Sequence, residues 1–468
     1  MNFASLPYLF FLITCAVIYY CIHKTFRNIF LLLASYFFYA LFGFGFTALM
    51  LITTLITYYS SHYSYHAKSN STRKLFLGIG LGLDLLIFVL FKYVHIIDID
   101  LMNWPNWSAQ KLLIPIGISF YTFKTVGYCI DLYKRKYEPD SSIINYALSV
   151  SFFPQLIAGP IEKSISISKQ LNSNTTFNLS NAIYGTKLIL WGLFKKIVIA
   201  DSIALIINPV FSDIYSYQGL DLFVCCLGFA IQIYADFSGY SDIAIGSASF
   251  FGVKLPPNFN KPYFSKNYRE FWVRWHATFS KWLKEYVFDP LGGVVKNNRL
   301  RTVFNIFILF LIVGCWHGAT LNYIIYAQCA FLFIILDIIT KDFRKKVFKK
   351  IGLLPKSFIL KIINYSSMVL MMTFLAIYFR PQSTDESNYI LSSISSFHFY
   401  HLGIKKAFYI FFYIIALEFL QYFQINANGH CFERINNFYL RACMYCFVLF
   451  SIMLFGSRPE VTFQYFQF

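Results

Sequence analysis

Residues 29–59 read IFLLLASYFFYALFGFGFTALMLITTLITYY, a run that contains no charged side chain. A single α-helix needs only ~20 apolar residues to cross a bilayer, so this run is too long for one span. The glycines of Phe42-Gly43-Phe44-Gly45 interrupt it, and glycine is disfavoured inside a helix. The stretch therefore predicts a hairpin of two membrane-spanning helices.

The composition of the whole chain agrees with this hairpin. Of the 468 residues, 57% are hydrophobic and only 13% are charged, whereas soluble proteins carry roughly 25% charged residues. A soluble enzyme and a disordered chain are therefore excluded. The apolar runs are continuous, which also excludes a transmembrane β-barrel, whose strands alternate in polarity. The prediction is an all-α polytopic membrane protein with about 11 to 13 spans.

The other spans are expected at apolar runs along the whole chain. No hydrophilic stretch is long enough for a separate soluble domain, so we expect one membrane domain over residues 1–468. The runs are Leu6–Ile22, Leu75–His95, Leu112–Asp131, Ala182–Ile207, Leu220–Ile245, Val303–Val313, Tyr323–Ile339, Ile359–Phe379, Phe408–Phe423 and Cys443–Phe455.

The basic residues indicate how the chain is oriented. Lys and Arg number 40 against 22 Asp and Glu, a formal net charge of +18. They occur in short clusters between apolar runs, not on one domain as in a nucleic-acid-binding protein. Because such loops face the cytoplasm, we expect Lys341–Lys350 to be cytoplasmic and the basic-poor loop Asp98–Gln110 to lie outside, as does the N-terminus. The expected location is the inner, or cytoplasmic, membrane.

Two segments near the middle of the chain, one apolar and one polar, are not expected to be plain spans. Pro154–Pro160 is bracketed by prolines, so it is either a re-entrant turn or a kinked core helix. Asp236-Phe-Ser-Gly-Tyr-Ser-Asp242 places Asp236, Ser238 and Tyr240 within a span. These three residues either bind neighbouring helices together or line a hydrophilic tunnel.

Two further segments carry histidines. Residues 269–286 predict one amphipathic helix, with aromatic residues on one face and Arg274, Lys281 and Lys284 on another. It either anchors the chain to anionic lipid or binds an anionic donor, and His276 lies between its two faces. In Gly314-Cys-Trp-His317-Gly-Ala319, small residues flank an imidazole. His317 is either a core residue or a general base.

The cysteines do not predict a metal site. Most of the 10 cysteines lie in apolar runs, where cysteine is a small core residue. Cys443 and Cys446 have the spacing of a metal or redox pair, but no second pair or histidine is near them in the sequence.

These segments resemble the membrane-bound O-acyltransferase family, in its bacterial branch of alginate and peptidoglycan O-acetyltransferases and teichoic-acid D-alanyl transferases. The resemblance extends over most of the chain and includes Ile114–Phe123, Phe153–Ile161, Gly192–Asp201, Asp236–Asp242, Arg269–Gly293, Gly314–Ala319 and Phe379-Arg380.

The resemblance implies a catalytic core of about residues 110–330, with His317 as catalytic histidine and His276 as second histidine of the site. It implies spans arranged around a central tunnel, lined in part by Trp316, in which a cytoplasmic acyl donor meets an outward-facing acceptor. Two departures concern the donor contacts. Val273 stands where a second arginine is usual, and Tyr326-Ala327 and Ala330 replace a Trp-Gly and a further histidine.

The expected reaction is direct acyl transfer to a hydroxyl, with His317 as the base. The chain lacks the Gly-x-Ser-x-Gly pattern of a serine nucleophile. The expected donor is acetyl-CoA or another acyl thioester, a substrate rather than a bound cofactor. The expected partners are the lipid bilayer, a polysaccharide acceptor and an extracytoplasmic accessory transferase, but no nucleic acid. A transporter or flippase of a lipid-linked glycan, with His317 and Asp236 on its pathway, is the alternative.

Overall fold

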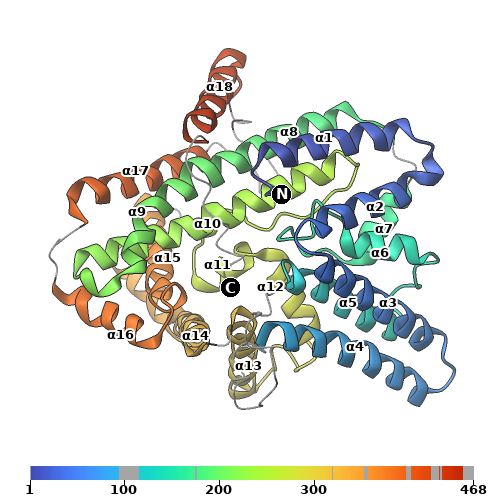
Figure 1. The fold of residues 1–468 in the computed structure, drawn as a ribbon. Helices are drawn as coiled ribbons and strands as arrows, with labels where there is room; N and C mark the ends of the chain where they lie inside the picture. The colour runs from blue at the N-terminus through green and yellow to red at the C-terminus, as the bar shows by residue number, and fades with distance from the viewer. Residues whose placement is uncertain are drawn as a thin grey trace, which may run out of the picture. The chain divides into compact units, whose positions relative to one another are not determined.

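The fold is helical throughout the part of the chain that the computed structural model describes (Figure 1). The described residues are 2–93, 115–173, 176–318, 320–352, 357–396, 402–422, 432 and 435–456. Among them, 7 helices are long and apolar enough to cross a membrane, and α1 (Leu6–Cys21) is a shorter apolar helix. The all-α polytopic prediction is confirmed.

The break predicted in the first quoted stretch is present, and of the two helices that it separates only the second is among the 7 that are long and apolar enough to cross a membrane. Helix α2 (Arg27–Ala40) is followed by α3 (Phe44–His66). Gly43 joins them at a φ of 149°, a backbone conformation that residues with a Cβ rarely adopt. The glycine therefore separates two helices that their apolar composition alone would merge.

The other expected spans also contain helices. The bounds are α4 (Asn70–Tyr93), α5 (Ile118–Tyr133), α8 (Leu179–Leu193), α9 (Asp201–Ser212), α10 (Leu220–Ser249), α13 (Arg299–His317), α14 (Leu321–Lys350), α15 (Phe358–Phe379), α17 (Gly403–Tyr422) and α18 (Phe438–Phe455). The expected outer loop, residues 98–110, lies outside the described residues.

The chain divides into two compact units. Unit 1 contains residues 1–189 and 240–256, and unit 2 contains residues 190–239 and 257–468. The core of unit 1 is rich in tyrosine, with Tyr39, Tyr121 and Tyr146 fully buried. Around this core pack α3, α4 and α5 and two short helices, α6 (Ile143–Ser151) and α7 (Ser164–Asn172).

The segment Pro154–Pro160 follows α6 as a series of buried turns, not as a kinked helix. Its polar groups are bonded inside unit 1. The Gln155 side chain donates to the Pro160 carbonyl, and Lys124 of α5 donates to Gln155 Oε1 at 2.9 Å. The backbone N–H of Phe153 donates to Ser35 Oγ of α2 at 3.1 Å. Irregular backbone is thus accommodated because it lies within protein.

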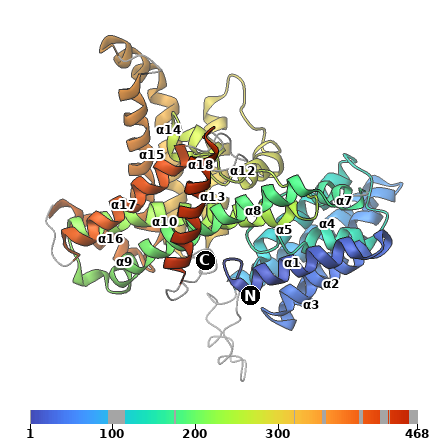
Figure 2. The ribbon, with the colours of Figure 1, turned by 90° about the horizontal axis from the view of Figure 1, so that it is seen from above.

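Unit 2 is built around the long helices α13, α14 and α15, of which α14 and α15 run side by side (Figure 2). Two expected single helices are irregular: the first contains a π-helical stretch, and the second is broken. Residues 194–200 between α8 and α9 form a π-helical stretch, η4. Residues 269–286 form α11 (Tyr268–Arg274), α12 (Ala277–Leu283) and the π-helical η7 (Lys284–Phe288).

The prediction of one amphipathic helix over residues 269–286 was therefore wrong. The break falls at His276, whose φ of 44° and ψ of 51° are left-handed. Continuous helix requires negative φ, so aromatic residues before and after His276 do not share one helical face. The remaining short elements are η1 (Lys24–Phe26), η5 (Ile214–Ser216), η6 (Pro262–Phe264), α16 (Thr384–Ser393) and η8 (Ile394–Ser396).

Candidate active site

Unit 2 contains a cavity of about 890 Å³ whose wall includes both predicted histidines, His276 and His317. Helices α10 to α15 all contribute to it. Most of the wall is aromatic and aliphatic, with Phe237, Phe279 and Trp316 close to the histidines. Such a cavity, apolar with a few placed polar groups, is typical of a binding site for an organic substrate.

His276 is held in one orientation by Asn258. Its Nδ1 lies 2.9 Å from Asn258 Oδ1, which also accepts hydrogen bonds from Thr278 Oγ1 at 2.8 Å and from the Thr278 backbone N–H at 3.4 Å. The Thr278 N–H can only donate, so the atom that it contacts is the amide oxygen. Nδ1 of His276 must then carry the proton, and Nε2 has the lone pair.

Burial keeps this imidazole neutral. His276 is only 5% exposed, and burial lowers the pKa of the imidazole from 6.5 to about 3 because the charged form loses its hydration. Phe237 and Phe279 pack against the ring at centroid distances of 4.8 and 5.0 Å. His276 therefore presents an uncharged acceptor nitrogen at physiological pH.

His317 is the last residue of α13. Its ring packs edge-on against Tyr326 of α14 and Phe379 of α15, at centroid distances of 5.5 and 5.0 Å. One turn earlier, Gly314 brings α13 close to α14. A Cβ added at Gly314 would lie 2.9 Å from the Tyr323 carbonyl oxygen. Close packing of three helices therefore positions the imidazole.

Trp316 contacts both histidines. Its ring centroid lies 4.5 Å from that of His317 and 6.3 Å from that of His276. Phe279 stacks on the same indole at 4.3 Å. Trp316 was predicted to line a tunnel, and the structure places it in the cavity wall between the two imidazoles.

Two of the cationic residues of the wall, Arg299 and Lys341, lie far from His317. Arg269, Lys284, Arg299 and Lys341 line the cavity, together with the carboxylate Asp342. Arg299 begins α13 and His317 ends it, so a rise of 1.5 Å per residue separates them by about 27 Å along the helix. Lys341 belongs to the same end as Arg299, because α14 begins only four residues after α13 ends and packs back along it. The cavity therefore has a cationic end and a histidine end.

Of the three cations predicted to bind the donor, only Lys284 lines this cavity. Its ammonium pairs with Asp289 at 2.8 Å. Arg274 pairs with Glu270 at 2.6 Å, and Lys281 is exposed on α12. The sequence reasoning missed Arg269, Arg299 and Lys341. The sequence could have indicated Arg299 and Lys341, because Arg299 stands just before one apolar run and Lys341 just after the next.

The predicted tunnel residues of α10 do not line this cavity. The Asp236 carboxylate forms an ion pair with the Lys196 ammonium at 2.9 Å, and Ser238 Oγ accepts a hydrogen bond from Lys195 Nζ at 3.0 Å. Tyr240 is buried in unit 1, where its ring packs on Phe3. The helical repeat explains this placement: Phe229, Ile233 and Phe237 share the face of α10 that borders the cavity.

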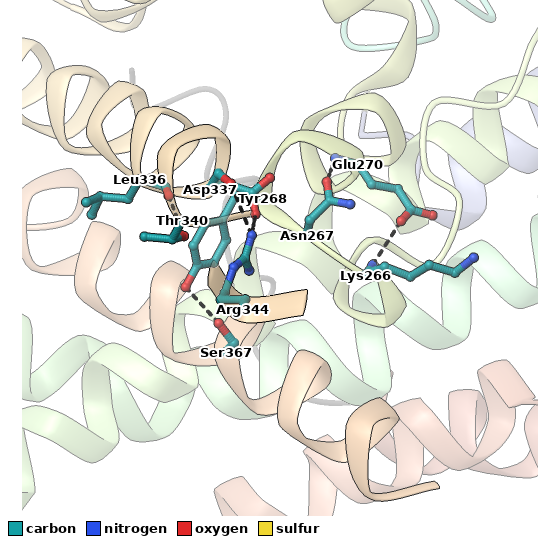
Figure 3. Close-up of polar contacts among 9 residues, drawn as sticks. All are labelled: Lys266, Asn267, Tyr268, Glu270, Leu336, Asp337, Thr340, Arg344 and Ser367. Atoms are coloured by element: carbon teal, nitrogen blue, oxygen red, sulfur yellow. Dashed lines mark hydrogen bonds and ion pairs between the residues drawn. The ribbon is translucent and has the colours of Figure 1, made fainter. Parts of the chain in front are cut away.

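Polar contacts connect the start of α11 to α15, beside the cationic end (Figure 3). Tyr268 Oη lies 2.7 Å from Ser367 Oγ of α15. Its ring packs edge-on against Phe333 of α14 at a centroid distance of 5.2 Å. Also on α14, the Asp337 carboxylate pairs with the Arg344 guanidinium (Figure 3). Within the described residues, no group of three or more His, Cys, Asp or Glu could hold a metal ion.

Comparison with known proteins identifies similar sequences. The profile of the MBOAT, membrane-bound O-acyltransferase family, matches residues 138–379, which include both histidines. A probable alginate O-acetylase, AlgI, of Pseudomonas syringae pv. tomato is 32% identical over 407 residues, 85% of this chain and 76% of that protein.

Two other relatives are named for different activities. The peptidoglycan O-acetyltransferase of Helicobacter pylori is 34% identical over 66% of this chain and 63% of its own length. The teichoic acid D-alanyltransferase of Bacillus subtilis is 29% identical over 47% of this chain and 58% of its own length. The chain thus spans less than two thirds of the length of these two relatives.

Proposed function

Because this chain belongs to the membrane-bound O-acyltransferase family, and is therefore a multi-pass membrane O-acyltransferase, we propose a specific route for the acyl group. An acetyl group enters from a thioester donor on the cytoplasmic side, crosses the cavity of unit 2 and is transferred to an acceptor hydroxyl near His317. The observation that carries this proposal is a single cavity whose wall includes both histidines and also Arg299 and Lys341, which lie at the other ends of α13 and α14 from His317.

The cationic end suits a donor that carries phosphates. Arg269, Arg299 and Lys341 supply positive charge where α11, α13 and α14 border the cavity, and arginine binds phosphate oxygens through several N–H groups. The distance of about 27 Å along α13 requires a long donor, with its charge at one end and its reactive group at the other. Acetyl-CoA has this design, and it is the donor that we propose.

In the proposed reaction, His317 acts as the general base. The acceptor hydroxyl oxygen attacks the thioester carbonyl carbon while the imidazole takes the hydroxyl proton. The C–S bond then breaks, and the thiolate receives that proton from the imidazolium. His276 stays neutral and offers Nε2 as a hydrogen-bond acceptor that orients the acceptor hydroxyl. The aromatic wall excludes water, which would otherwise hydrolyse the thioester.

The relatives indicate the class of acceptor. One relative is named for alginate and another for peptidoglycan, so we propose a cell-surface polysaccharide or peptidoglycan as the final acceptor. The two longest loops expected on the outer side, residues 98–110 and about 381–401, are too short in sequence to fold into a domain that binds a polymer. An extracytoplasmic accessory transferase therefore receives the acetyl group and passes it to the polymer, and the chain acts in the inner membrane.

The catalytic assignment can be tested in proteoliposomes supplied with radiolabelled acetyl-CoA and a soluble hydroxyl acceptor. We expect His317→Ala to reduce transfer by roughly 10²- to 10⁴-fold, the usual contribution of a positioned general base. His66→Ala, which changes an exposed histidine at the end of α3, is the matched control. Wild-type turnover in a correctly inserted His317→Ala protein would exclude His317 as the base.

The accessory transferase is tested separately with the purified chain, acetyl-CoA and polymer as the only components. We expect thioester turnover on small hydroxyl acceptors but no acetylated polymer until an extracytoplasmic fraction is added. Efficient polymer acetylation by the purified chain alone would show that it is a complete polymer acetyltransferase. A result of this kind would leave the assignment of His317 intact.

A further inference from the structure

A second cavity, of about 300 Å³, lies in unit 1 and contains none of the residues assigned above to acyl transfer. One side of the cavity is formed by the end of α1, the turn η1 and the start of α2. The other side is formed by the start of α6 and the end of α7. The residues that line it are Tyr19, Lys24, Thr25, Arg27, Asn28, Ile29, Ser142, Ile144, Asn145, Leu171, Asn172 and Ser173.

The polar groups of this cavity are cationic or neutral. Lys24 and Arg27 contribute two positive charges, and none of the described residues that line the cavity carries a carboxylate. The remaining polar side chains are hydroxyls and amides. A concave surface of this composition attracts an anion, because it offers charge and hydrogen-bond donors without a competing negative group.

Arg27 is held in a fixed orientation. Its guanidinium lies over the rings of Tyr19 and Tyr20, 5.0 and 5.3 Å from their centroids, and Nη2 donates to the Tyr20 carbonyl at 3.4 Å. Stacking on two aromatic rings restricts the side chain before any ligand binds. A guanidinium positioned in this way loses less conformational entropy on binding a phosphate than a mobile lysine does.

Three asparagines connect the two sides of the wall. Asn28 donates both of its amide hydrogens, to Asn145 Oδ1 at 2.9 Å and to Asn172 Oδ1 at 2.7 Å. Asn145 is thereby oriented with its oxygen toward Asn28 and its NH₂ group elsewhere. Within the described part of the chain, this NH₂ group donates to no protein acceptor. It is therefore available to a ligand in the cavity.

Apolar side chains beside the cavity indicate where the ligand comes from. Ile29 lines the cavity and is 40% exposed. On either side along the chain, Val17 of α1, Phe26 of η1 and Leu33 of α2 are more exposed, at 58%, 60% and 64%. In a membrane protein, such side chains contact lipid tails. A cationic, amide-lined cavity next to a lipid-exposed apolar surface matches an anionic phospholipid.

We propose that this cavity binds a phosphate group and that the phosphate belongs to an anionic phospholipid. Arg27 and Lys24 neutralise the phosphate charge, the Asn145 NH₂ donates to a phosphate oxygen, and the acyl chains lie against the exposed faces of α1 and α2. The basic residues Lys24 and Arg27 place the cavity on the cytoplasmic side of the membrane, where anionic lipids attract lysine and arginine. The site is independent of the proposed acyl transfer, because it needs neither histidine.

The test is lipid binding by the full-length chain, measured by native mass spectrometry after delipidation in neutral detergent. Phosphatidylglycerol and phosphatidylcholine are titrated separately, and inorganic phosphate is added in a third series. We expect phosphatidylglycerol to bind at least about tenfold more tightly than phosphatidylcholine, as one charge-assisted contact predicts. Millimolar inorganic phosphate should not displace it. Equal binding of the two lipids would overturn the proposal, and displacement by inorganic phosphate would assign the site to free phosphate instead.

Two variants locate the binding to this cavity. Arg27→Gln removes the stacked cation, and Asn145→Asp replaces the donating NH₂ by a carboxylate while keeping an oxygen for Asn28. Each should weaken phosphatidylglycerol binding by about tenfold or more. Lys68→Gln, at an exposed position of unit 1, is the matched control and should bind as the wild type does. The proposal fails if Asn145→Asp and Arg27→Gln both fold and retain wild-type binding.

Discussion

At the scale of single residues, His276 shows how a backbone conformation determines side-chain chemistry. Its left-handed φ of 44° ends α11 and starts α12, and histidine is one of the few residue types that tolerate this region. The turn places Nδ1 against Asn258 and buries the ring. The sequence identified the residue but not the break, because neither glycine nor proline marks the position.

The buried neutral ring predicts a pH dependence of stability. The unfolded chain binds a proton at this imidazole below pH 6.5, whereas the folded chain does so only near pH 3. This difference does not lower the free energy of unfolding above pH 6.5, where the imidazole is neutral in both states. Between pH 6.5 and about pH 3 the free energy of unfolding falls by about 1.4 kcal/mol per pH unit. We therefore expect the thermal midpoint of the wild type to fall between pH 7 and pH 5 more steeply than that of His276→Asn.

Asparagine is the chosen replacement because it tolerates the left-handed backbone and does not titrate. His23→Asn, at an exposed histidine between α1 and η1, is the matched control for the removal of an imidazole. Thermal unfolding in detergent, followed by intrinsic fluorescence at several pH values, measures the difference. If the thermal midpoints of the wild type and His276→Asn changed in parallel with pH, His276 would bind its proton equally well in the folded and unfolded states, and the prediction would be wrong.

At the scale of helices, close contacts and buried charges decide the packing around the site. Lys196 in η4 pairs with Asp201 at 2.6 Å and with Asp236 of α10 at 2.9 Å, and all three are largely buried. Removing one partner from such a group leaves an uncompensated charge and is strongly destabilising. The sequence could not separate the two interpretations of Asp236, because Lys196 lies on a different element and only the fold brings the two together.

The contact between α13 and α14 predicts the effect of a single methyl group. Gly314→Ala would place a Cβ 2.9 Å from the Tyr323 carbonyl and 3.0 Å from Ile324 Cα, both of them backbone atoms of α14 that cannot rotate away. We expect a loss of about 1–3 kcal/mol in the free energy of unfolding, typical of overpacking. Acetyl transfer should also fall, because His317 lies one turn beyond.

The matched control is Gly78→Ala in α4, where a Cβ would meet no atom within 4 Å. That substitution should keep or slightly raise stability, because alanine favours helix. Thermal unfolding and turnover are measured on both variants. If Gly314→Ala matched Gly78→Ala in both measurements, the two helices would be free to separate and the close contact would not position His317.

At the scale of the whole molecule, apolar periodicity located the helices well. Burial in lipid requires every span to satisfy its own backbone, so long apolar runs must be helical. Helix interruptions were harder to predict. Gly43 marks one directly in the sequence, whereas the π-helical η4 and the turn at His276 arise from packing and side-chain contacts. The histidines of the site were identified, but its cationic end came from helix termini distant in the sequence.

The orientation of the molecule in the membrane remains a prediction from its basic residues. We expect single cysteines introduced at residues 341–350 to react with a membrane-impermeant thiol reagent only from the cytoplasmic side. Cysteines at residues 98–110 should react only from the other side. The measurement uses intact cells and inverted vesicles, with a variant from which the native cysteines have been removed. Labelling of both segments from one side would contradict the predicted orientation.

The buried turns of residues 153–160 have a consequence for how the chain is made. Their polar groups depend on Ser35 of α2 and Lys124 of α5, and in lipid each unsatisfied backbone group costs several kcal/mol. Both partners precede the turns in the chain, so the ribosome delivers them first. The nascent segment can therefore leave the translocon directly into a protein environment, and unit 1 can assemble in the order of its synthesis.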